Sequence, residues 1–268
     1  MVSVSVLLLL SVVSSCATDE PSAEAPTTPP SRPLPSESSA LPEVGQCHDI
    51  PDHVLSSFYD PSPVVSCAEP HTTETVDVSQ VVERPTKQLL DHLSSGCQES
   101  VISYIGMSER LRLITQGYLF ASAPSETPRW VRCDVIMWAD THDTAFGERT
   151  GSEKDVVLWD YTSVRPCLDE IWDGSKVQRY VSCKKPHLVE SPSQLIYLPT
   201  TGRYPPADVL RRQGRSKCHA LIAKRPDHDR LVVVPEWVSR DSWVRNAPQM
   251  VGTCWYHRVD GEKLPPLP

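Results

Sequence analysis

Two matching sets of four cysteines constrain the fold of this chain more than any other feature of its sequence. The third and fourth cysteines of each set are 36 residues apart, and the motif Val-Ser-Cys-x-x-Pro-His-x-x-Glu surrounds the second cysteine of each set. A spacing and a motif that recur together predict an internal duplication. The first set is Cys47, Cys67, Cys97 and Cys133, and the second is Cys167, Cys183, Cys218 and Cys254.

The cysteine content predicts an oxidising compartment, because nine thiols without metal-binding spacing are unusual in a reducing one. Eight of the nine can pair, which leaves Cys16 over. Four cysteines allow three pairings, and the constant 36-residue spacing favours first with second and third with fourth. The expected disulfides are Cys47–Cys67, Cys97–Cys133, Cys167–Cys183 and Cys218–Cys254.

The amino terminus has the pattern of a bacterial lipoprotein signal. The apolar run Val2–Val13 is too short to span a bilayer and has the length of a signal-peptide core. Val13-Ser14-Ser15-Cys16 is similar to a lipobox, so we expect a signal peptide over 1–15 and lipidation, with palmitate or a similar acyl chain, at Cys16. A plain secretory signal is the alternative. No Lys or Arg precedes the apolar run, which a misplaced start codon or a weakly processed signal would explain.

The segment behind Cys16 is rich in Pro, Ser, Thr and Glu and has little to bury. Such a segment cannot offset its own ordering entropy. We therefore expect residues 16–43 to be the anchor and an extended spacer, with prolines that stiffen it. The folded part is then expected to comprise one repeat over 44–160, a second over 161–257, and a flexible tail over 258–268.

Each repeat is expected to be an α+β domain, with one main helix packed on a small antiparallel sheet. Apolar residues recur at helical spacing over Thr86–Ile105 and Ala207–Ile222, so each helix carries the third cysteine on its apolar face. Prolines just before both segments fit helix starts. Runs rich in β-branched and aromatic residues predict strands that carry the second and fourth cysteines. These runs are Pro63–Cys67, Val131–Trp138, Gln178–Cys183 and Leu231–Val234.

The motif around the second cysteine, with Gly45-Gln46-Cys47 before it and a helix cysteine after it, resembles the septum formation domain family. The resemblance covers residues 44–160 and 164–257. The family consists of secreted or membrane-anchored actinobacterial proteins, many of them lipoproteins, which implies a role in division or envelope assembly but no reaction. Thr150-Gly151-Ser152 is similar to the family's terminal Gly-Ser step. The second repeat departs from the family at Arg165-Pro166-Cys167 and is expected to have a truncated end.

The duplicated motif supplies the candidate site residues His71, Glu74, His187 and Glu190. A catalytic zinc site needs three protein ligands, whereas each motif supplies two, and residues three apart on a strand point to opposite faces. A histidine base would need a nucleophile, and no Gly-x-Ser-x-Gly turn is present. The favoured interpretation is a structural turn held by hydrogen bonds of the His and Glu, and contact with a ligand or partner is the alternative. We expect no metal and no cofactor.

Aromatic and basic residues give two weaker indications of a binding surface. Most tryptophans lie beside predicted strands and are expected in the core, while an exposed subset could line a glycan or peptide groove. The run Arg203–Arg230 is locally basic in a chain of net charge −8. This pattern is typical of a solvated helix face, with contact to teichoic acid, phospholipid or peptidoglycan as the alternative. The tryptophans are Trp130, Trp138, Trp159, Trp172, Trp237, Trp243 and Trp255.

The acidic balance argues against a nucleic-acid partner, which would need a basic surface. Together these features predict a non-catalytic protein, lipid-anchored to the extracytoplasmic face of the cell membrane. Its two interaction modules are expected to bind an envelope protein or a cell-wall component, and duplication favours bivalent or extended contact. The alternative function is an envelope metal-assisted hydrolase that uses the two His and Glu pairs.

Overall fold

The computed structural model describes residues 41–60, 62–108, 111–174, 176–200, 202–243 and 249–267. The predicted signal peptide, Cys16 and all but the last residues of the predicted spacer lie outside these ranges. None of the helices in the described ranges has the length and apolar character needed to cross a membrane.

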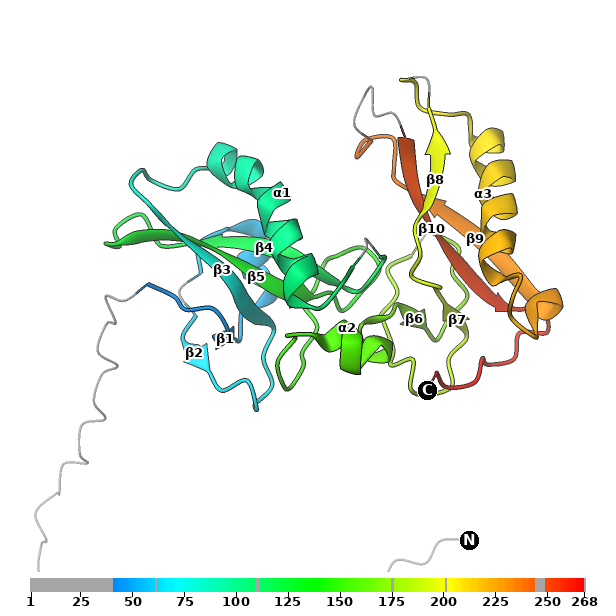
Figure 1. Cartoon of the computed structure of the whole chain (residues 1–268), viewed down its shortest axis with the longest axis horizontal. Helices are drawn as coiled ribbons and strands as arrows, with labels where there is room; N and C mark the ends of the chain where they lie inside the picture. Colours follow the sequence, from blue (N-terminus) through cyan, green and yellow to red (C-terminus); the bar gives the residue numbers. More distant parts are fainter. Residues whose placement is uncertain are drawn as a thin grey trace, which may run out of the picture. The chain divides into compact units, whose positions relative to one another are not determined.

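The first repeat folds as a five-stranded antiparallel sheet with one long helix packed on it (Figure 1). The strand order is β2-β1-β3-β5-β4, and α1 packs against β3, β4 and β5. A 3₁₀ turn over Asp52–Ser56 follows β1. The elements are β1 Cys47–His48, β2 Val64–Val65, β3 Thr73–Val81, α1 Lys87–Tyr104, β4 Thr115–Ala121 and β5 Arg129–Met137.

Helix α1 begins and packs as its sequence pattern predicts. The Thr86 side chain accepts a hydrogen bond from the Leu89 amide at 3.3 Å and caps the first turn. Farther along the helix, Cys97 and Val101 form the buried stripe and pack into a core with Val135 of β5. The apolar periodicity therefore places the third cysteine of the repeat against the sheet.

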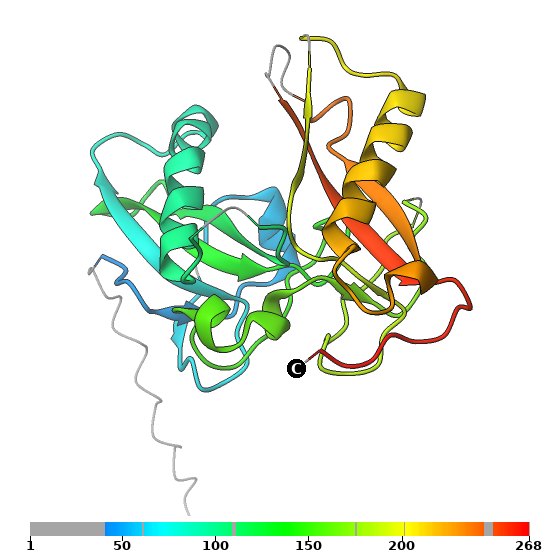
Figure 2. The ribbon, with the colours of Figure 1, turned by 45° about the vertical axis from the view of Figure 1, so that its right-hand side comes forward.

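The second repeat is built in the same way around the long strand β10. One edge of β10 pairs with β7 and β8, and the other edge pairs with β9. Helix α3 packs on β8, β9 and β10, and Figure 2 shows it lying along the β9–β10 hairpin. The elements are β6 Cys167–Leu168, β7 Val189–Glu190, β8 Ile196–Pro199, α3 Ala207–Ile222, β9 Leu231–Trp237 and β10 Gln249–Arg258. Between the repeats lie α2 Val156–Trp159 and a 3₁₀ turn over Tyr161–Val164, and another turn over His228–Arg230 precedes β9.

The strand register shows that the two sheets are equivalent. Val135, two residues after Cys133, pairs with Glu74, and Tyr256, two residues after Cys254, pairs with Glu190. Strands β7 and β8 together take the place of β3. The described residues all belong to one compact unit, so the duplication appears as two α+β sheets within that unit.

All four predicted disulfides are present. The pairs join Cys47 to Cys67, Cys97 to Cys133, Cys167 to Cys183, and Cys218 to Cys254. In each repeat the second bond ties the main helix to an interior strand of the sheet, β5 in the first repeat and β10 in the second. The 36-residue spacing predicts the pairing of the third and fourth cysteines, because it is the length of chain between a helix turn and the strand beneath it.

The strand predictions need correction around the first two cysteines of each repeat. The run Pro63–Cys67 contains the short strand β2, but Cys67 lies in the turn after it, and Cys183 likewise lies in a turn, whereas Cys47 and Cys167 begin strands. The run Gln178–Cys183 contains only isolated bridges. The disulfides to Cys47 and Cys167 hold the segments around Cys67 and Cys183 beside a strand, so these segments do not need a continuous series of backbone hydrogen bonds.

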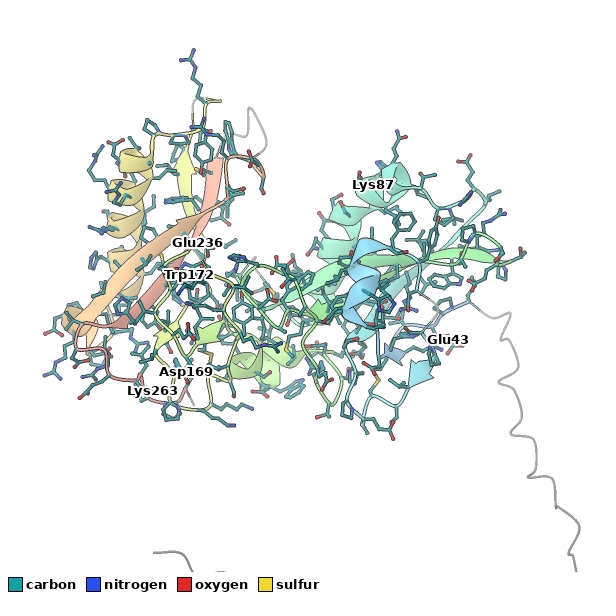
Figure 3. All side chains as sticks on the ribbon, turned by 180° about the vertical axis from the view of Figure 1, so that it is seen from behind. Glu43, Lys87, Asp169, Trp172, Glu236 and Lys263 are labelled. Atoms are coloured by element: carbon teal, nitrogen blue, oxygen red, sulfur yellow. A yellow bond between two sulfur atoms is a disulfide. The ribbon has the colours of Figure 1, made fainter. Side chains whose placement is uncertain are left out.

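The expected flexible tail over 258–268 is wrong. After β10 the chain turns back, and Leu264 exchanges backbone hydrogen bonds with His187 and is 1 % exposed. Leu267 donates its amide to the Cys183 carbonyl at 2.8 Å. The ammonium of Lys263 lies 2.5 Å from the Asp169 carboxylate, and Figure 3 shows the two side by side. A buried leucine and these bonds order a segment that looks polar and proline-rich in sequence.

Candidate functional site

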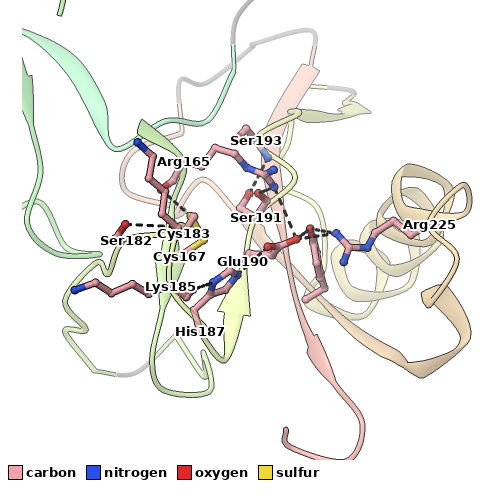
Figure 4. Close-up of a disulfide and its surroundings, with 12 residues drawn as sticks. Arg165, Cys167, Ser182, Cys183, Lys185, His187, Glu190, Ser191, Ser193 and Arg225 are labelled. Atoms are coloured by element: carbon pink, nitrogen blue, oxygen red, sulfur yellow. Dashed lines mark hydrogen bonds and ion pairs between the residues drawn. A yellow bond between two sulfur atoms is a disulfide. The ribbon is translucent and has the colours of Figure 1, made fainter. Parts of the chain in front are cut away.

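Glu190 is the centre of a buried polar cluster in the second repeat (Figure 4). Its carboxylate accepts a hydrogen bond from His187 Nε2 at 2.8 Å on one oxygen. The other oxygen accepts from Arg225 Nη1 at 2.7 Å and from the Tyr256 hydroxyl. The guanidinium of Arg165 lies 4.0 Å away. Glu190 is 1 % exposed, and these donors supply the hydrogen bonds that a buried carboxylate requires.

The imidazole of His187 is fixed at both ring nitrogens. Nδ1 donates to the carbonyl oxygen of Lys185 at 2.8 Å, and Nε2 faces Glu190. The His187 backbone pairs with Leu264, which closes the sheet on this side. The histidine therefore joins the turn after the second cysteine, the strand β7 and the carboxy-terminal segment.

Glu74 occupies the same position in the first repeat and has different donors. One oxygen accepts from the Tyr104 hydroxyl at 2.7 Å and from the Ser152 hydroxyl at 2.6 Å. The other accepts from the Glu153 amide at 2.5 Å. Glu74 is also buried. The first repeat thus stabilises the equivalent carboxylate with hydroxyls and a backbone amide, where the second repeat uses a histidine and an arginine.

One donor comes from the same place in both repeats. Tyr104 lies seven residues after Cys97, at the end of α1, and Arg225 lies seven residues after Cys218, just beyond α3. Both side chains reach back to the motif glutamate. The glutamate therefore ties the end of the main helix to the edge of the sheet in each repeat.

His71 closes the sheet of the first repeat as His187 closes the second. Its backbone exchanges hydrogen bonds with Arg149 at 2.9 and 3.0 Å, in the position that Leu264 has in the second repeat. Nδ1 donates to the Glu69 carbonyl at 2.8 Å. Nε2 is buried and has no partner among the described residues. The shared feature of the two histidines is therefore the turn and the backbone pairing rather than the contact with glutamate.

Burial shifts the pKa values of two side chains near Glu74. Burial lowers the pKa of Arg149 to about 10, although the negative charge of Glu74 acts in the opposite direction. Arg149 pairs with the buried Glu153. Burial and the hydrogen bond to Glu74 raise the pKa of Tyr104, so the phenol stays a donor across the ordinary pH range.

The prediction that His and Glu of the motif point to opposite faces is wrong for the second repeat, where they touch. The prediction assumed one strand through both residues, but β7 begins only at Val189. His187 lies in the bend before it, so the alternation of a regular strand does not apply between the two residues.

Each repeat brings potential metal ligands together, but the sulfurs are in disulfides. Ligand atoms of Cys167, His187 and Glu190 lie within 4.8 Å of one another, as do those of Cys47, Cys67 and Glu74 in the first repeat. A disulfide sulfur is not a thiolate, which is the form that binds metal. The oxidised second repeat thus retains two nitrogen or oxygen ligands, one fewer than a catalytic zinc site needs.

A second buried polar cluster is confined to the first repeat. The Arg132 guanidinium binds both oxygens of Asp134 at 3.1 and 3.0 Å and also pairs with Asp60. Thr73 donates to Asp134 at 2.9 Å. His48 lies in the same region, and its pKa is lowered by burial and by the charge of Arg132, against the opposing charges of both aspartates.

The equivalent positions of the second repeat are almost entirely apolar. The residue after the first cysteine is His48 in one repeat and Leu168 in the other. The residue after the fourth cysteine is Asp134 in one and Trp255 in the other. Leu168 and Trp255 pack together in a core cluster. The fold therefore does not require the charges of the first repeat, in line with the modest net value of buried ion pairs.

Four of the seven tryptophans are buried, which agrees with the expected core role of most of them. Trp159 is 60 % exposed, and Trp237 is half-buried beside α3. The basic run folds mainly as α3, whose Arg211, Arg212 and Arg215 are exposed. The buried tryptophans are Trp130, Trp138, Trp172 and Trp255.

Sequence reasoning found the two motif pairs but missed the residues that complete their clusters. Tyr104 and Arg225 carried a usable signal, because both lie at the same distance from the helix cysteine and can bind a carboxylate. Ser152 was noted only as part of the Gly-Ser step, without a link to Glu74. Tyr256 carried no signal, because its counterpart in the first repeat is the apolar Val135.

The chain matches no known protein-family model, no curated protein and no solved structure. The resemblance to the septum formation domain family therefore stays a prediction.

Proposed function

We propose that this protein is a non-catalytic, lipid-anchored envelope protein that acts as an interaction module on the extracytoplasmic face of the membrane. The observation that carries the proposal is the burial of the duplicated motif: His71, Glu74, His187 and Glu190 are each at most 2 % exposed. All four side chains make hydrogen bonds within their own repeat, and the one ring nitrogen without a partner among the described residues, His71 Nε2, is buried. Binding must then use other surfaces.

The lipobox-like Val13-Ser14-Ser15-Cys16 and the pairing of all eight other cysteines support the proposed anchor. Four disulfides fit an oxidising location. The resemblance to the septum formation domain family supports a role in division or envelope assembly, with a neighbouring envelope protein or a cell-wall component as partner and no nucleic acid.

Metabolic labelling with an alkyne analogue of palmitate tests the anchor. We expect labelling and membrane fractionation of the native chain, and loss of both in Cys16→Ser. Labelling that persists in Cys16→Ser would contradict the anchor. In-cell crosslinking of the anchored protein then identifies its neighbours, and an absence of envelope partners would contradict the interaction role.

The alternative is an envelope metal-assisted hydrolase. The grouping of Cys167, His187 and Glu190 within 4.8 Å is the one observation that favours it. This function would require the Cys167–Cys183 bond to open, because only a thiolate would complete the ligand set. A metal-dependent activity that appears on mild reduction and is absent from Cys167→Ser would favour the hydrolase.

A further inference from the structure

Strand β9 is an edge strand whose outer side is open. Its alternate residues Val233, Pro235 and Trp237 turn their backbone groups away from β10. Pro235 establishes this direction, because a proline without an N–H can stand in a strand only where the N–H would point outward. The amide of Val238 donates inward to Val251 at 3.1 Å, as the alternation requires. Within the described ranges β9 pairs with β10 alone.

The equivalent edge of the first repeat is closed by the protein itself. Gln98 of α1 donates to the Gly117 carbonyl at 2.8 Å and accepts from the Gly117 amide at 3.3 Å, as a neighbouring strand would. Farther along β4, the Ala121 amide donates to the Phe58 carbonyl at 2.8 Å. The first repeat thus satisfies the outward backbone groups that an edge strand leaves unpaired.

The second repeat lacks both parts of this closure. Gln98 follows Cys97, whereas the residue that follows Cys218 is His219, whose exposed side chain makes no hydrogen bond to the described residues. Gly117 corresponds to Val233 by register. A Cβ at Gly117 would lie 3.2 Å from the Gln98 amide nitrogen, so a valine there would crowd such a closure.

A groove of about 410 Å³ runs beside the open edge, between β9 and α3. Val233, Pro235 and Trp237 line one side of it, and Leu210 lies on the helix side. Such a groove between a helix and an edge strand is a common place for an extended peptide to add to a sheet.

The rim of the groove is basic in a chain of net charge −8. Arg211 and Arg215 line the groove from one face of α3. Asp208, the acid nearest to them on this helix, binds Arg212 at 3.2 Å. Glu236 of β9 is bound to the Trp255 indole at 2.8 Å. The two arginines at the rim therefore complement carboxylates on a ligand.

We propose that the α3–β9 groove binds an extended acidic peptide segment of an envelope partner, which adds to β9 as a further strand. The inference rests on the proposed interaction function and names its surface and the chemistry of its partner. Backbone groups of Val233 and Trp237 pair with the peptide, and Arg211 and Arg215 bind its acidic side chains.

Fluorescence anisotropy of the purified oxidised chain tests the proposal, with a labelled peptide of alternating threonine and glutamate as the probe. We expect saturable binding that weakens with salt, and at least about tenfold weaker binding of a threonine–lysine peptide. Arg211→Glu with Arg215→Glu is expected to weaken binding to a similar extent. Arg84→Glu with Lys87→Glu makes the same change of charge at exposed sites near the start of α1 and is the matched control.

Two changes separate strand addition from charge alone. Val233→Pro removes one outward N–H and leaves the ladder to β10 intact, so it should weaken binding about tenfold or more. Because this variant can alter folding, the same test is made on native protein with two threonine–glutamate peptides, one N-methylated at its odd residues and one at its even residues. The peptide whose methyl groups replace the N–H groups that face β9 should fail to bind. If neither change weakens binding, strand addition is refuted.

Two competitors define the other outcomes. If poly(glycerol phosphate) displaces the probe and N-methylation of the peptide has no effect, the ligand is an anionic polymer and the proposal of a peptide is overturned. A synthetic peptide of residues 17–43 that binds more tightly than the probe would overturn a separate partner in favour of the chain's own spacer. If the peptide fails to bind while the native chain is labelled normally at Cys16, this inference alone is refuted. If the native chain is not labelled, the anchor is refuted and the proposal for the groove is unaffected.

Discussion

Replacing Glu190 by glutamine tests whether the motif glutamate stabilises the fold, because the change replaces only one carboxylate oxygen by an NH₂ group. Glu190→Gln keeps the shape of the side chain but removes its charge and turns one oxygen into an N–H donor. Tyr256 and Arg225 donate to one oxygen, and His187 faces the other. With its amide nitrogen toward His187 the glutamine can donate to the imidazole, and with the nitrogen on the other side Tyr256 and Arg225 lose their acceptor, but Arg225 loses this carboxylate partner in either orientation.

The structure sets the size of the expected loss. Removing one partner of a fully buried ion pair costs about 3–5 kcal/mol. Arg225 is 28 % exposed at its side chain and keeps Asp227 as a partner at 3.1 Å, so part of this cost is recovered from solvent and from Asp227. We therefore expect Glu190→Gln to lower the free energy of unfolding by about 2–3 kcal/mol, or the melting temperature by about 5–10 °C for a unit of this size.

Urea and thermal unfolding followed by circular dichroism, with disulfides intact, measure the change. Glu170→Gln removes a charge from an exposed carboxylate with no partner among the described residues and is the matched control. We expect it to change the free energy of unfolding by less than about 0.5 kcal/mol. If Glu190→Gln proves as mild as the control, the argument that this carboxylate holds the helix to the sheet is refuted.

Three further predictions follow from other parts of the structure. Burial lowers the pKa of His48 from 6.5, so below that pH the unfolded chain binds a proton that the folded chain does not. As the pH decreases below 6.5, the free energy of unfolding therefore falls by up to about 1.4 kcal/mol per pH unit. His48→Leu, which copies Leu168, should give a shallower slope of urea-unfolding free energy against pH, and an unchanged slope would refute the assignment. Cys218→Ala with Cys254→Ala opens a loop of 36 residues and should cost about 4 kcal/mol in urea unfolding; a cost below about 1 kcal/mol would contradict this. Leu264→Ala should cost about 2–5 kcal/mol by calorimetry, whereas a flexible tail would give no change.

The cysteine framework and the main helices could be predicted from sequence because each has a local or periodic signal. The 36-residue spacing favoured the pairing of Cys97 with Cys133, which the structure has, and apolar periodicity located α3 at its observed bounds. Strands β3 and β4 were missed. Both carry polar and small residues, such as Asp77 and Gly117, that weaken a strand pattern and are explained only by their neighbours in the fold.

The candidate site was only half visible in the sequence. The two histidines and two glutamates recur and could be selected, but the tertiary partners Ser152 and Tyr256 have no fixed distance from them in the chain. The closing segment at Leu264 was misjudged because short polar and proline-rich ends are usually mobile. Its place in the core depends on a backbone pairing with His187 that no local pattern encodes.

Metal content and stability, measured together on native protein and on His187→Ala, test most directly whether the duplicated motif is structural. The account predicts purified oxidised protein without stoichiometric zinc, and a lower melting temperature for His187→Ala because the turn before β7 loses both ring hydrogen bonds. About one zinc ion per chain, lost in His187→Ala at an unchanged melting temperature, would contradict the account and favour a metal centre.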